Sequence, residues 1–169
     1  MKDYQWYSDQ WGQSTKDDDI LFLLLTIGVF QTGLSWKVAA GKKEIFMRNF
    51  CGMDFRKVAA LFPEDAEEIA KDPEMIRNPR KINAVIQNAR AIVGLLDDYD
   101  SFADYLWDFV GGVPVVKQYE TEDQVTNTLP EATTIAKDMK KRGFTFVGPV
   151  VTCMFLKAAG IIQDQVLDQ

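Results

Sequence analysis

Few side chains in this sequence could carry out acid–base or metal chemistry, because the chain contains no histidine. Without histidine there can be no Ser–His or Cys–His nucleophile pair and no histidine-containing zinc site. Cys51 and Cys153 are the only cysteines, and their separation predicts small buried apolar side chains rather than a disulfide or metal site. Acid–base chemistry must therefore use carboxylates, tyrosine, lysine or cysteine, and we expect no bound metal and no cofactor.

A second chemical feature is a run of positive charge between Met75 and Leu96, where every charged residue is basic. These residues are Arg77, Arg80, Lys81 and Arg90. They flank a predicted helix start, whose unpaired N–H groups and positive dipole end suit one phosphate group. The alternative is a solvated basic helix start. The whole chain has 19 basic and 25 acidic residues, so its net charge of −6 argues against bulk electrostatic capture of DNA but leaves room for a local basic face.

The elements that must position these groups are predicted to be helices joined by short turns. The clearest helix begins with Asn78 as its cap and Pro79 as its first residue, and then carries apolar residues at helical spacing as far as Leu96. The other helices are expected over residues 20–32, 36–50, 55–62, 63–70, 101–110, 130–142 and 148–160. Residues 113–128 predict a long loop, and no alternating run predicts a sheet. We expect an all-α fold in a single domain, 1–169.

The apolar segments do not predict a membrane protein. The longest apolar run, Ile20–Phe30, is too short to cross a bilayer, and the polar and aromatic residues Met1–Asp9 do not resemble a secretion signal. We therefore expect a cytoplasmic protein without a membrane partner.

Four short motifs occur in an order and at a spacing that resemble one known family. They are Tyr7-Ser8-Asp9-Gln10-Trp11-Gly12, Gln31-Thr32-Gly33-Leu34-Ser35-Trp36, Ile76-Arg77-Asn78-Pro79-Arg80-Lys81-Ile82 with Asn88-Ala89-Arg90 downstream, and Lys140-Lys141-Arg142-Gly143-Phe144-Thr145-Phe146-Val147-Gly148. Together they resemble the DNA-3-methyladenine glycosylase I family over nearly the whole chain.

The resemblance implies an all-helical, DNA glycosylase-like fold with a helix-hairpin-helix at about 63–96. Its parts would be the helix Pro63–Ala70, the hairpin Lys71–Asn78 and the helix from Pro79. The hairpin would bind double-stranded DNA, and we expect its DNA-binding residues to be Arg77, Asn78, Arg80 and Lys81.

The resemblance also implies a pocket for a base that has been flipped out of the DNA stack. Tyr7, Trp11 and Trp36 match family pocket aromatics, although each could instead pack in the core. Asp9 is the carboxylate that could act in catalysis, or it could cap a helix. Among the residues expected to contact DNA, Leu34 would fill the gap left by the flipped base, and Gln31 and Ser35 flank it.

At one pocket position the chain departs from the family, which has a glutamate where this sequence has Gly28. A glycine inside an apolar helix costs about 1 kcal/mol relative to alanine, so it calls for a reason. Two reasons stay open: Gly28 lines a widened base pocket, or it allows close helix packing.

The family's zinc ligands are also missing. The N-terminal cysteine has no counterpart near Met1–Trp6. The two histidine positions hold Ser8 and Gln165, and the final cysteine position falls near Gln169. Because all four are absent together, we expect packing alone to hold the two termini.

Three functions remain in order of preference. The first is a base-excision glycosylase for alkylated purines such as 3-methyladenine, and the second is a non-catalytic module that senses damaged or abasic DNA. The third is a structural or protein-interaction domain. The residue at position 28 distinguishes the glycosylase from the DNA sensor. The basic hairpin distinguishes both of these functions from a structural domain.

Overall fold

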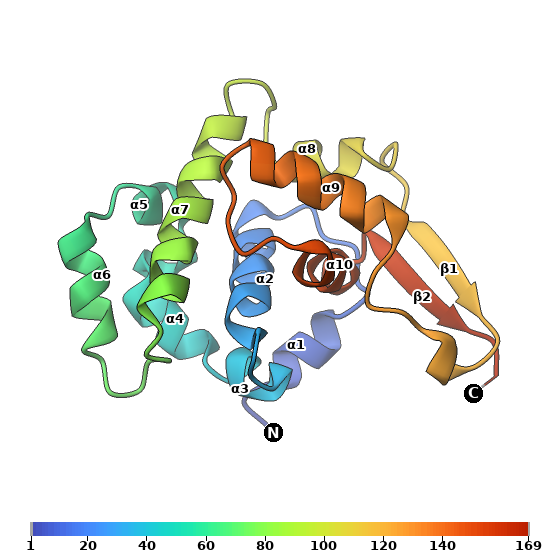
Figure 1. Cartoon of the computed structure of the whole chain (residues 1–169), viewed down its shortest axis with the longest axis horizontal. Coiled ribbons are helices and arrows are strands. Elements are labelled where there is room, and N and C mark those ends of the chain that lie inside the picture. Colours follow the sequence, from blue (N-terminus) through green and yellow to red (C-terminus); the bar gives the residue numbers. More distant parts are fainter. Residues whose placement is uncertain (1, 169) are drawn as a thin grey trace.

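Helices make up most of the chain in the computed structural model, which describes residues 2–168 (Figure 1). The α-helices are α1 (Gln5–Gln10), α2 (Asp18–Gln31), α3 (Trp36–Ala40), α4 (Lys43–Asn49), α5 (Phe55–Ala59), α6 (Pro63–Ala70), α7 (Pro79–Leu95), α8 (Phe102–Asp108), α9 (Pro130–Lys141) and α10 (Pro149–Ala158). The remaining elements are the strands β1 (Val115–Tyr119) and β2 (Ile162–Val166) and the short 3-10 helices η1 (Cys51–Met53) and η2 (Glu122–Gln124). The predicted all-α fold class is confirmed.

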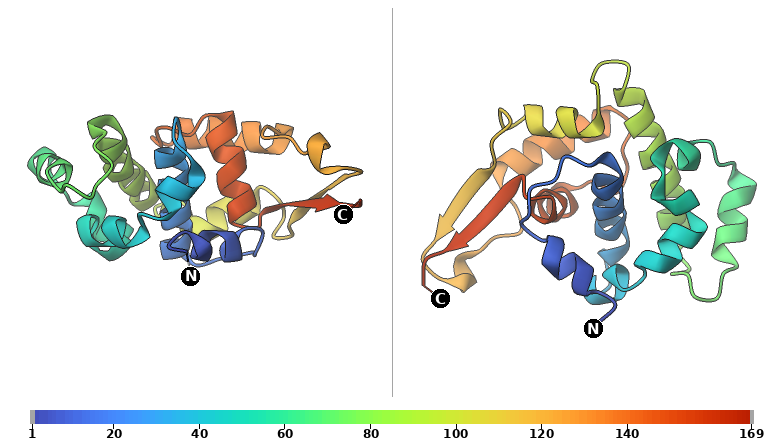
Figure 2. Two further views of the ribbon diagram at one scale, coloured as in Figure 1. Left: turned by 90° about the horizontal axis from the view of Figure 1, so that it is seen from below. Right: turned by 180° about the vertical axis from the view of Figure 1, so that it is seen from behind.

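Helix α2 runs through the centre of the molecule, and its position follows from its sequence. Asp17 caps it, because the Asp17 carboxylate accepts hydrogen bonds from the backbone N–H groups of Asp19 at 2.9 Å and Ile20 at 3.2 Å. Every residue from Leu21 to Phe30 is buried, as expected of a helix that is apolar on all sides. Helices α3, α7, α8 and α10 pack around it, and the view from behind in Figure 2 shows α10 end-on beside it.

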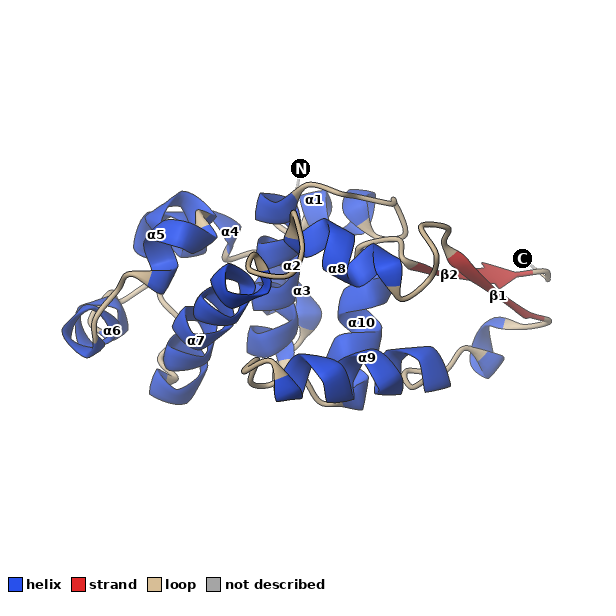
Figure 3. Ribbon diagram, turned by 90° about the horizontal axis from the view of Figure 1, so that it is seen from above, coloured by secondary structure: helices blue, strands red, loops and turns tan. Residues whose placement is uncertain are grey.

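Helices α6 and α7 lie together at one end of the molecule, joined by the hairpin 71–78 (Figure 3). Asn78 caps α7 through its side-chain oxygen, which accepts from the backbone N–H of Lys81 at 3.2 Å, and Pro79 is the first helical residue. These two predictions are confirmed. By contrast, the single helix expected over 36–50 is two helices, α3 and α4, which are interrupted at Gly41, where a helix is least favoured.

The region expected to be a long loop contains a strand, and this is the main correction to the predicted fold. Strand β1 pairs in parallel with β2, with Val115 opposite Ile162 and Tyr119 opposite Val166. Neither strand alternates clearly between apolar and polar residues, so the periodicity that predicts strands was absent. No helix within residues 2–168 combines the length and the apolar character needed to cross a bilayer.

Candidate base-binding site

A cavity of about 370 Å³ lies where α1, α2, α3 and α10 meet. It is lined by Tyr7, Ser8, Trp11, Gln31, Trp36 and Met154. The three aromatic residues that the sequence analysis assigned to a pocket are therefore brought together. Met154 was missed, because it lies in α10 outside the four motifs. A cavity of this size and apolar lining suits a flat heterocycle.

The aromatic rings of the cavity support one another. The Tyr7 and Trp36 ring centres lie 5.8 Å apart with a 31° angle between planes, and Tyr7 and Trp11 lie 5.7 Å apart at 62°. Tyr4, which the sequence analysis missed, meets Trp36 edge to face at 5.3 Å. Its helical spacing from Tyr7 is a signal that could have identified it. The flat faces held in this way are the groups on which a nucleobase stacks.

The polar groups of the cavity are neutral. Tyr7 is 3% exposed, and its burial raises the pKa of the phenol, so its hydroxyl stays protonated near pH 7 and can donate a hydrogen bond. Gln31 has a buried side-chain oxygen without a hydrogen-bond partner within residues 2–168. Such an orphaned acceptor in a binding cavity suits an N–H group of a ligand. No acidic residue is among those that line the cavity.

Two residues assigned to the site lie outside the cavity lining. Asp9 is exposed on α1, where its carboxylate accepts a hydrogen bond at 3.0 Å from the Gln5 side chain. Gly28 is buried, and a Cβ atom added to it would lie 3.4 Å from Cγ1 of Val151 in α10. Of the two reasons offered for this glycine, its position at the contact between α2 and α10 favours close helix packing, and its role in the base pocket stays a prediction.

The turn between α2 and α3 projects apolar side chains into solvent. Leu34 is 44% exposed and Trp36 is 37% exposed, and Gly33 before them adopts a positive φ of 79° that favours glycine. The hydroxyl of Ser35 accepts from the backbone N–H of Val38 at 3.2 Å and so caps α3. Leu34 therefore has no role in the core.

The hairpin presents its N–H groups and two exposed cations at the start of α7. Arg77 and Arg80 are exposed, and the Arg80 guanidinium lies 5.7 Å from the ring centre of Phe146. Pro79 has no N–H and the N–H of Lys81 is bonded to Asn78, so the start of α7 offers an anion its positive dipole end and the two arginines. This geometry suits a phosphate group.

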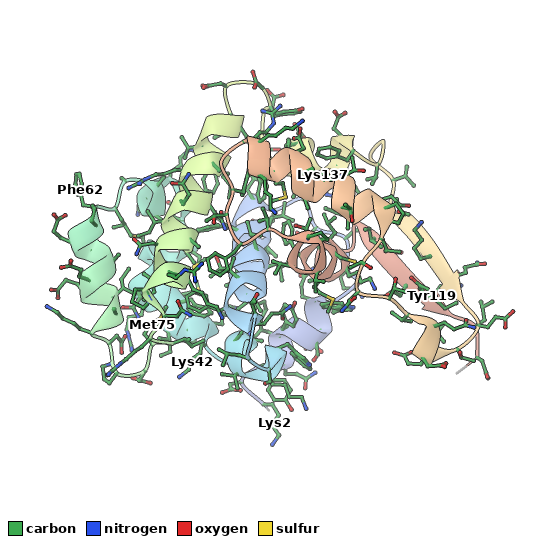
Figure 4. All side chains as sticks on the ribbon, in the orientation of Figure 1. Lys2, Lys42, Phe62, Met75, Tyr119 and Lys137 are labelled. Atoms are coloured by element: carbon green, nitrogen blue, oxygen red, sulfur yellow. The ribbon has the colours of Figure 1, made fainter. Side chains whose placement is uncertain are left out.

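Contacts with α4 hold the hairpin in place. The Asp72 carboxylate lies 2.6 Å from the Arg48 guanidinium and accepts from the Asn49 amide at 2.8 Å, while Lys42 donates to the Glu74 carbonyl at 2.7 Å. The hydrogen bond from Asn49 and then that from Arg48 lower the pKa of Asp72 to about 2. Figure 4 labels Lys42 and Met75, which mark the two sides of this contact.

Lys81 was predicted to bind DNA, and the structure corrects this prediction. The side chain is only 5% exposed, and its ammonium group donates to the backbone carbonyls of Phe30, at 3.0 Å, and Thr32. A lysine turned inward in this way cannot meet a phosphate on the surface. Burial lowers the pKa of its ammonium group.

The positions that match the family's zinc ligands have other roles. Ser8 lines the cavity, and the Gln165 side chain in β2 accepts from Gln118 at 2.9 Å. Gln169 lies outside the described residues. The C-terminal strand is held instead by the buried Lys157, whose ammonium lies 2.9 Å from the Asp164 carboxylate. Within residues 2–168, no cluster of histidine, cysteine, aspartate and glutamate could hold a metal ion.

An aromatic cavity, an exposed apolar turn and a basic hairpin between two helices are the features expected of a helical DNA glycosylase domain. A family model described as methyladenine glycosylase matches residues 1–168. The chain belongs to this family.

Curated relatives match over almost the whole chain. The DNA-3-methyladenine glycosylase 1 of Escherichia coli (strain K12) is 34% identical over 162 residues, which cover 96% of this chain and 87% of the relative. A DNA-3-methyladenine glycosylase of Haemophilus influenzae is 27% identical over 163 residues, which cover 96% of this chain and 88% of the relative.

Solved structures of similar proteins share the fold. A mutant of 3-methyladenine DNA glycosylase I from Staphylococcus aureus superposes with a TM-score of 0.93 at 33% identity, covering 99% of this chain and 90% of that one. Another mutant 3-methyladenine DNA glycosylase I, in complex with 3-methyladenine, gives a TM-score of 0.90 at 33% identity, covering 94% and 86%.

Proposed function

We propose that this protein is a base-excision DNA glycosylase that hydrolyses the N-glycosidic bond of alkylated purines such as 3-methyladenine. The observation that carries the proposal is the aromatic cavity formed by Tyr7, Trp11 and Trp36, which adjoins the exposed turn bearing Leu34. The names of the family and of its relatives point to the same activity. The neighbour in complex with 3-methyladenine supports this choice of base.

Each part of the surface would supply one step of base flipping. The start of α7, with Arg77 and Arg80, binds the backbone of double-stranded DNA beside the lesion. Leu34 fills the gap in the duplex after the damaged base leaves the stack, and Trp36 and Tyr7 stack against the flipped base. The same contacts predict binding to abasic sites, because an abasic site offers the gap without the cost of unstacking a base.

The chemistry follows from the charge of the lesion. A purine alkylated at N3 carries a positive charge, so it departs as a neutral base and takes the electron pair of the glycosidic bond with it. Water adds to the sugar carbon and loses a proton to solvent. Because the leaving group is already good, no acid is needed, which fits a cavity whose lining includes no carboxylate. The neutral hydroxyl of Tyr7 and the amide of Gln31 orient the base by hydrogen bonds.

We further infer that the chain works as one helical domain in the cytoplasm, the compartment in which a bacterial repair enzyme meets its DNA. One cluster of buried apolar residues extends from Tyr7 in α1 to Ile162 in β2, which supports the single domain.

A non-catalytic sensor of damaged or abasic DNA is the second candidate. The observation in its favour is that Gly28 stands where the family has a glutamate, so the cavity has no carboxylate to stabilise a cationic base. A sensor would keep Leu34, Trp36 and the hairpin and would release nothing.

Base release from methylated DNA distinguishes the two candidates. Methylated duplex DNA is incubated with the parent protein, with Trp36→Ala and with Phe109→Ala, and the free bases are quantified by mass spectrometry. Phe109 is a matched control, since it is an aromatic residue at the end of α8, exposed at 39% against 37% for Trp36, and it lines neither the cavity nor the hairpin. We expect the parent and Phe109→Ala to release 3-methyladenine and Trp36→Ala to release much less. A parent that binds abasic duplex but releases no base would establish the sensor.

A further inference from the structure

Lys81 joins the two parts of the surface that the proposed function assigns to DNA. It lies in the first turn of α7, where its backbone N–H is bonded to the capping side chain of Asn78 at 3.2 Å. Its ammonium group reaches the other way, to the carbonyls of Phe30 at 3.0 Å and Thr32. Phe30 belongs to the last turn of α2, and Thr32 is the residue that follows the helix.

The placement of this cation has an electrostatic explanation. The last carbonyl groups of a helix have no partner within the helix and form its negative dipole end, so a cation placed there is stabilised. None of the ion pairs within residues 2–168 includes Lys81, so these carbonyls are its main compensation for burial. Its hydrogen bonds therefore hold the end of α2 tightly against the start of α7.

The turn that carries Leu34 lies between two held points, the Thr32 carbonyl and the ring of Trp36, which packs against Tyr4 and Tyr7. Gly33 has a positive φ of 79°, and Leu34 is exposed, with its N–H bonded to the Gln31 carbonyl at 2.8 Å. Ser35 then caps α3, which begins with Trp36. Of these two held points, the Thr32 carbonyl is the one that Lys81 joins to α7 and so to the hairpin.

We propose that Lys81 is a positioning residue that fixes the Leu34 turn relative to the phosphate-binding hairpin, so that phosphate binding and insertion of Leu34 take place together. This inference rests on the proposed function, because it assigns Leu34 to the gap beside a flipped base. Lys81 itself touches neither DNA nor base. Replacing Lys81 should leave binding of the hairpin to the DNA backbone intact. Insertion of Leu34 should then no longer depend on that binding.

The test is a double-mutant cycle between Lys81 and Leu34. Affinities for an undamaged duplex and for the same duplex with a tetrahydrofuran abasic site are measured for the parent, Lys81→Met, Leu34→Ala and the double variant. We expect Lys81→Met to bind undamaged duplex as the parent does and to lose about tenfold in its preference for the abasic duplex. When Lys81→Met is already present, adding Leu34→Ala should reduce the preference for the abasic duplex only slightly further.

Controls separate positioning from stability. Lys81→Arg keeps the cation and should retain most of the preference, whereas Lys137→Met removes an exposed lysine of α9 (Figure 4) and should change nothing. Hydrogen exchange of the free protein should speed up in residues 31–36 of Lys81→Met while the core helices keep their protection. If Lys81→Met does not fold, Lys81→Gln, which is uncharged and one atom shorter, should show the same losses.

The outcomes distinguish this inference from the proposed function. Additive effects of Lys81→Met and Leu34→Ala, or an unchanged preference in Lys81→Met, would overturn the role of Lys81 while leaving the proposed function in place. A parent with no preference for the abasic duplex would overturn the proposed function and this inference with it.

Discussion

Gly28 in α2 lies against Val151 in α10, and a Cβ atom on Gly28 would meet Cγ1 of Val151 at 3.4 Å, the distance of a van der Waals contact. The two helices therefore touch at the position where the family has a glutamate. Gln31 and Met154, which lie one helical turn further along α2 and α10, line the cavity. The family's carboxylate position is thus a helix contact beneath the cavity in this chain.

Substitutions at Gly28 should follow this contact. Gly28→Ala should raise stability by up to about 1 kcal/mol, because alanine favours a helix over glycine and the new Cβ meets Val151 at van der Waals distance. Gly28→Glu should lower the melting temperature strongly, because its charge would be buried without a partner. Adding Val151→Ala should restore part of the loss by making room. Thermal melting of the four proteins checks this, and a fully stable Gly28→Glu would return the position to the cavity wall.

Leu34→Ala should weaken binding to abasic duplex while leaving the fold nearly as stable as before. Leu34 is 44% exposed, so its truncation should avoid the roughly 2–5 kcal/mol that truncating a buried leucine costs. Val38→Ala removes a similarly exposed side chain from the adjacent helix and serves as the control. Paired measurements of melting temperature and abasic-DNA affinity test the prediction; a large loss of stability with unchanged affinity would contradict it.

DNA binding by the hairpin should be sensitive to salt despite the acidic composition. Arg77 and Arg80 are exposed at the start of α7, and replacing either arginine should reduce the salt dependence of log K by about one, because one phosphate is no longer neutralised. Lys57→Ala, which removes an exposed cation from α5, should leave the salt dependence unchanged. If the variant with both Arg77→Ala and Arg80→Ala binds DNA as tightly as the parent at every salt concentration, DNA binds elsewhere on the protein.

The contribution of Asp72 to stability, through its contacts between the hairpin and α4, should depend on pH. The pKa of Asp72 is about 2 in the folded protein, below the value of about 3.9 expected in an unfolded chain. Asp72 therefore stabilises the folded state fully at a pH above about 3.9. The effect is lost as the pH falls through about 2. Asp72→Asn should therefore melt below the parent at pH 7, and the gap should close as the solution is acidified. Glu68→Gln, in an exposed ion pair with Lys71, should show almost no gap at any pH. A gap that persists unchanged into strong acid would exclude this role.

What could be predicted from the sequence was local or carried by motifs. Asn78 and Pro79 fixed the start of α7 because a cap and a first-turn proline act within one turn of chain. Tyr7, Trp11 and Trp36 were assigned together through their motifs, and the cavity they line agrees with that assignment.

The errors arose from contacts between distant segments. Strand β1 is defined by its pairing with β2, which follows it only after α9 and α10. Lys81 was assigned to DNA because it belongs to the basic run at the start of α7, and its burial depends on the carbonyls at the end of α2, which no local pattern reveals. Gly28 was ambiguous because its partner, Val151, lies in another helix.

If the aromatic cavity is a base-binding site, it should bind the damaged base itself. Isothermal titration of free 3-methyladenine into the parent, Trp36→Ala and Phe62→Ala measures this without DNA. We expect one bound molecule per chain in the parent and in Phe62→Ala, and a strongly weakened affinity in Trp36→Ala, which loses one stacking face. Equal affinity in the parent and Trp36→Ala, or no binding to the parent, would contradict it.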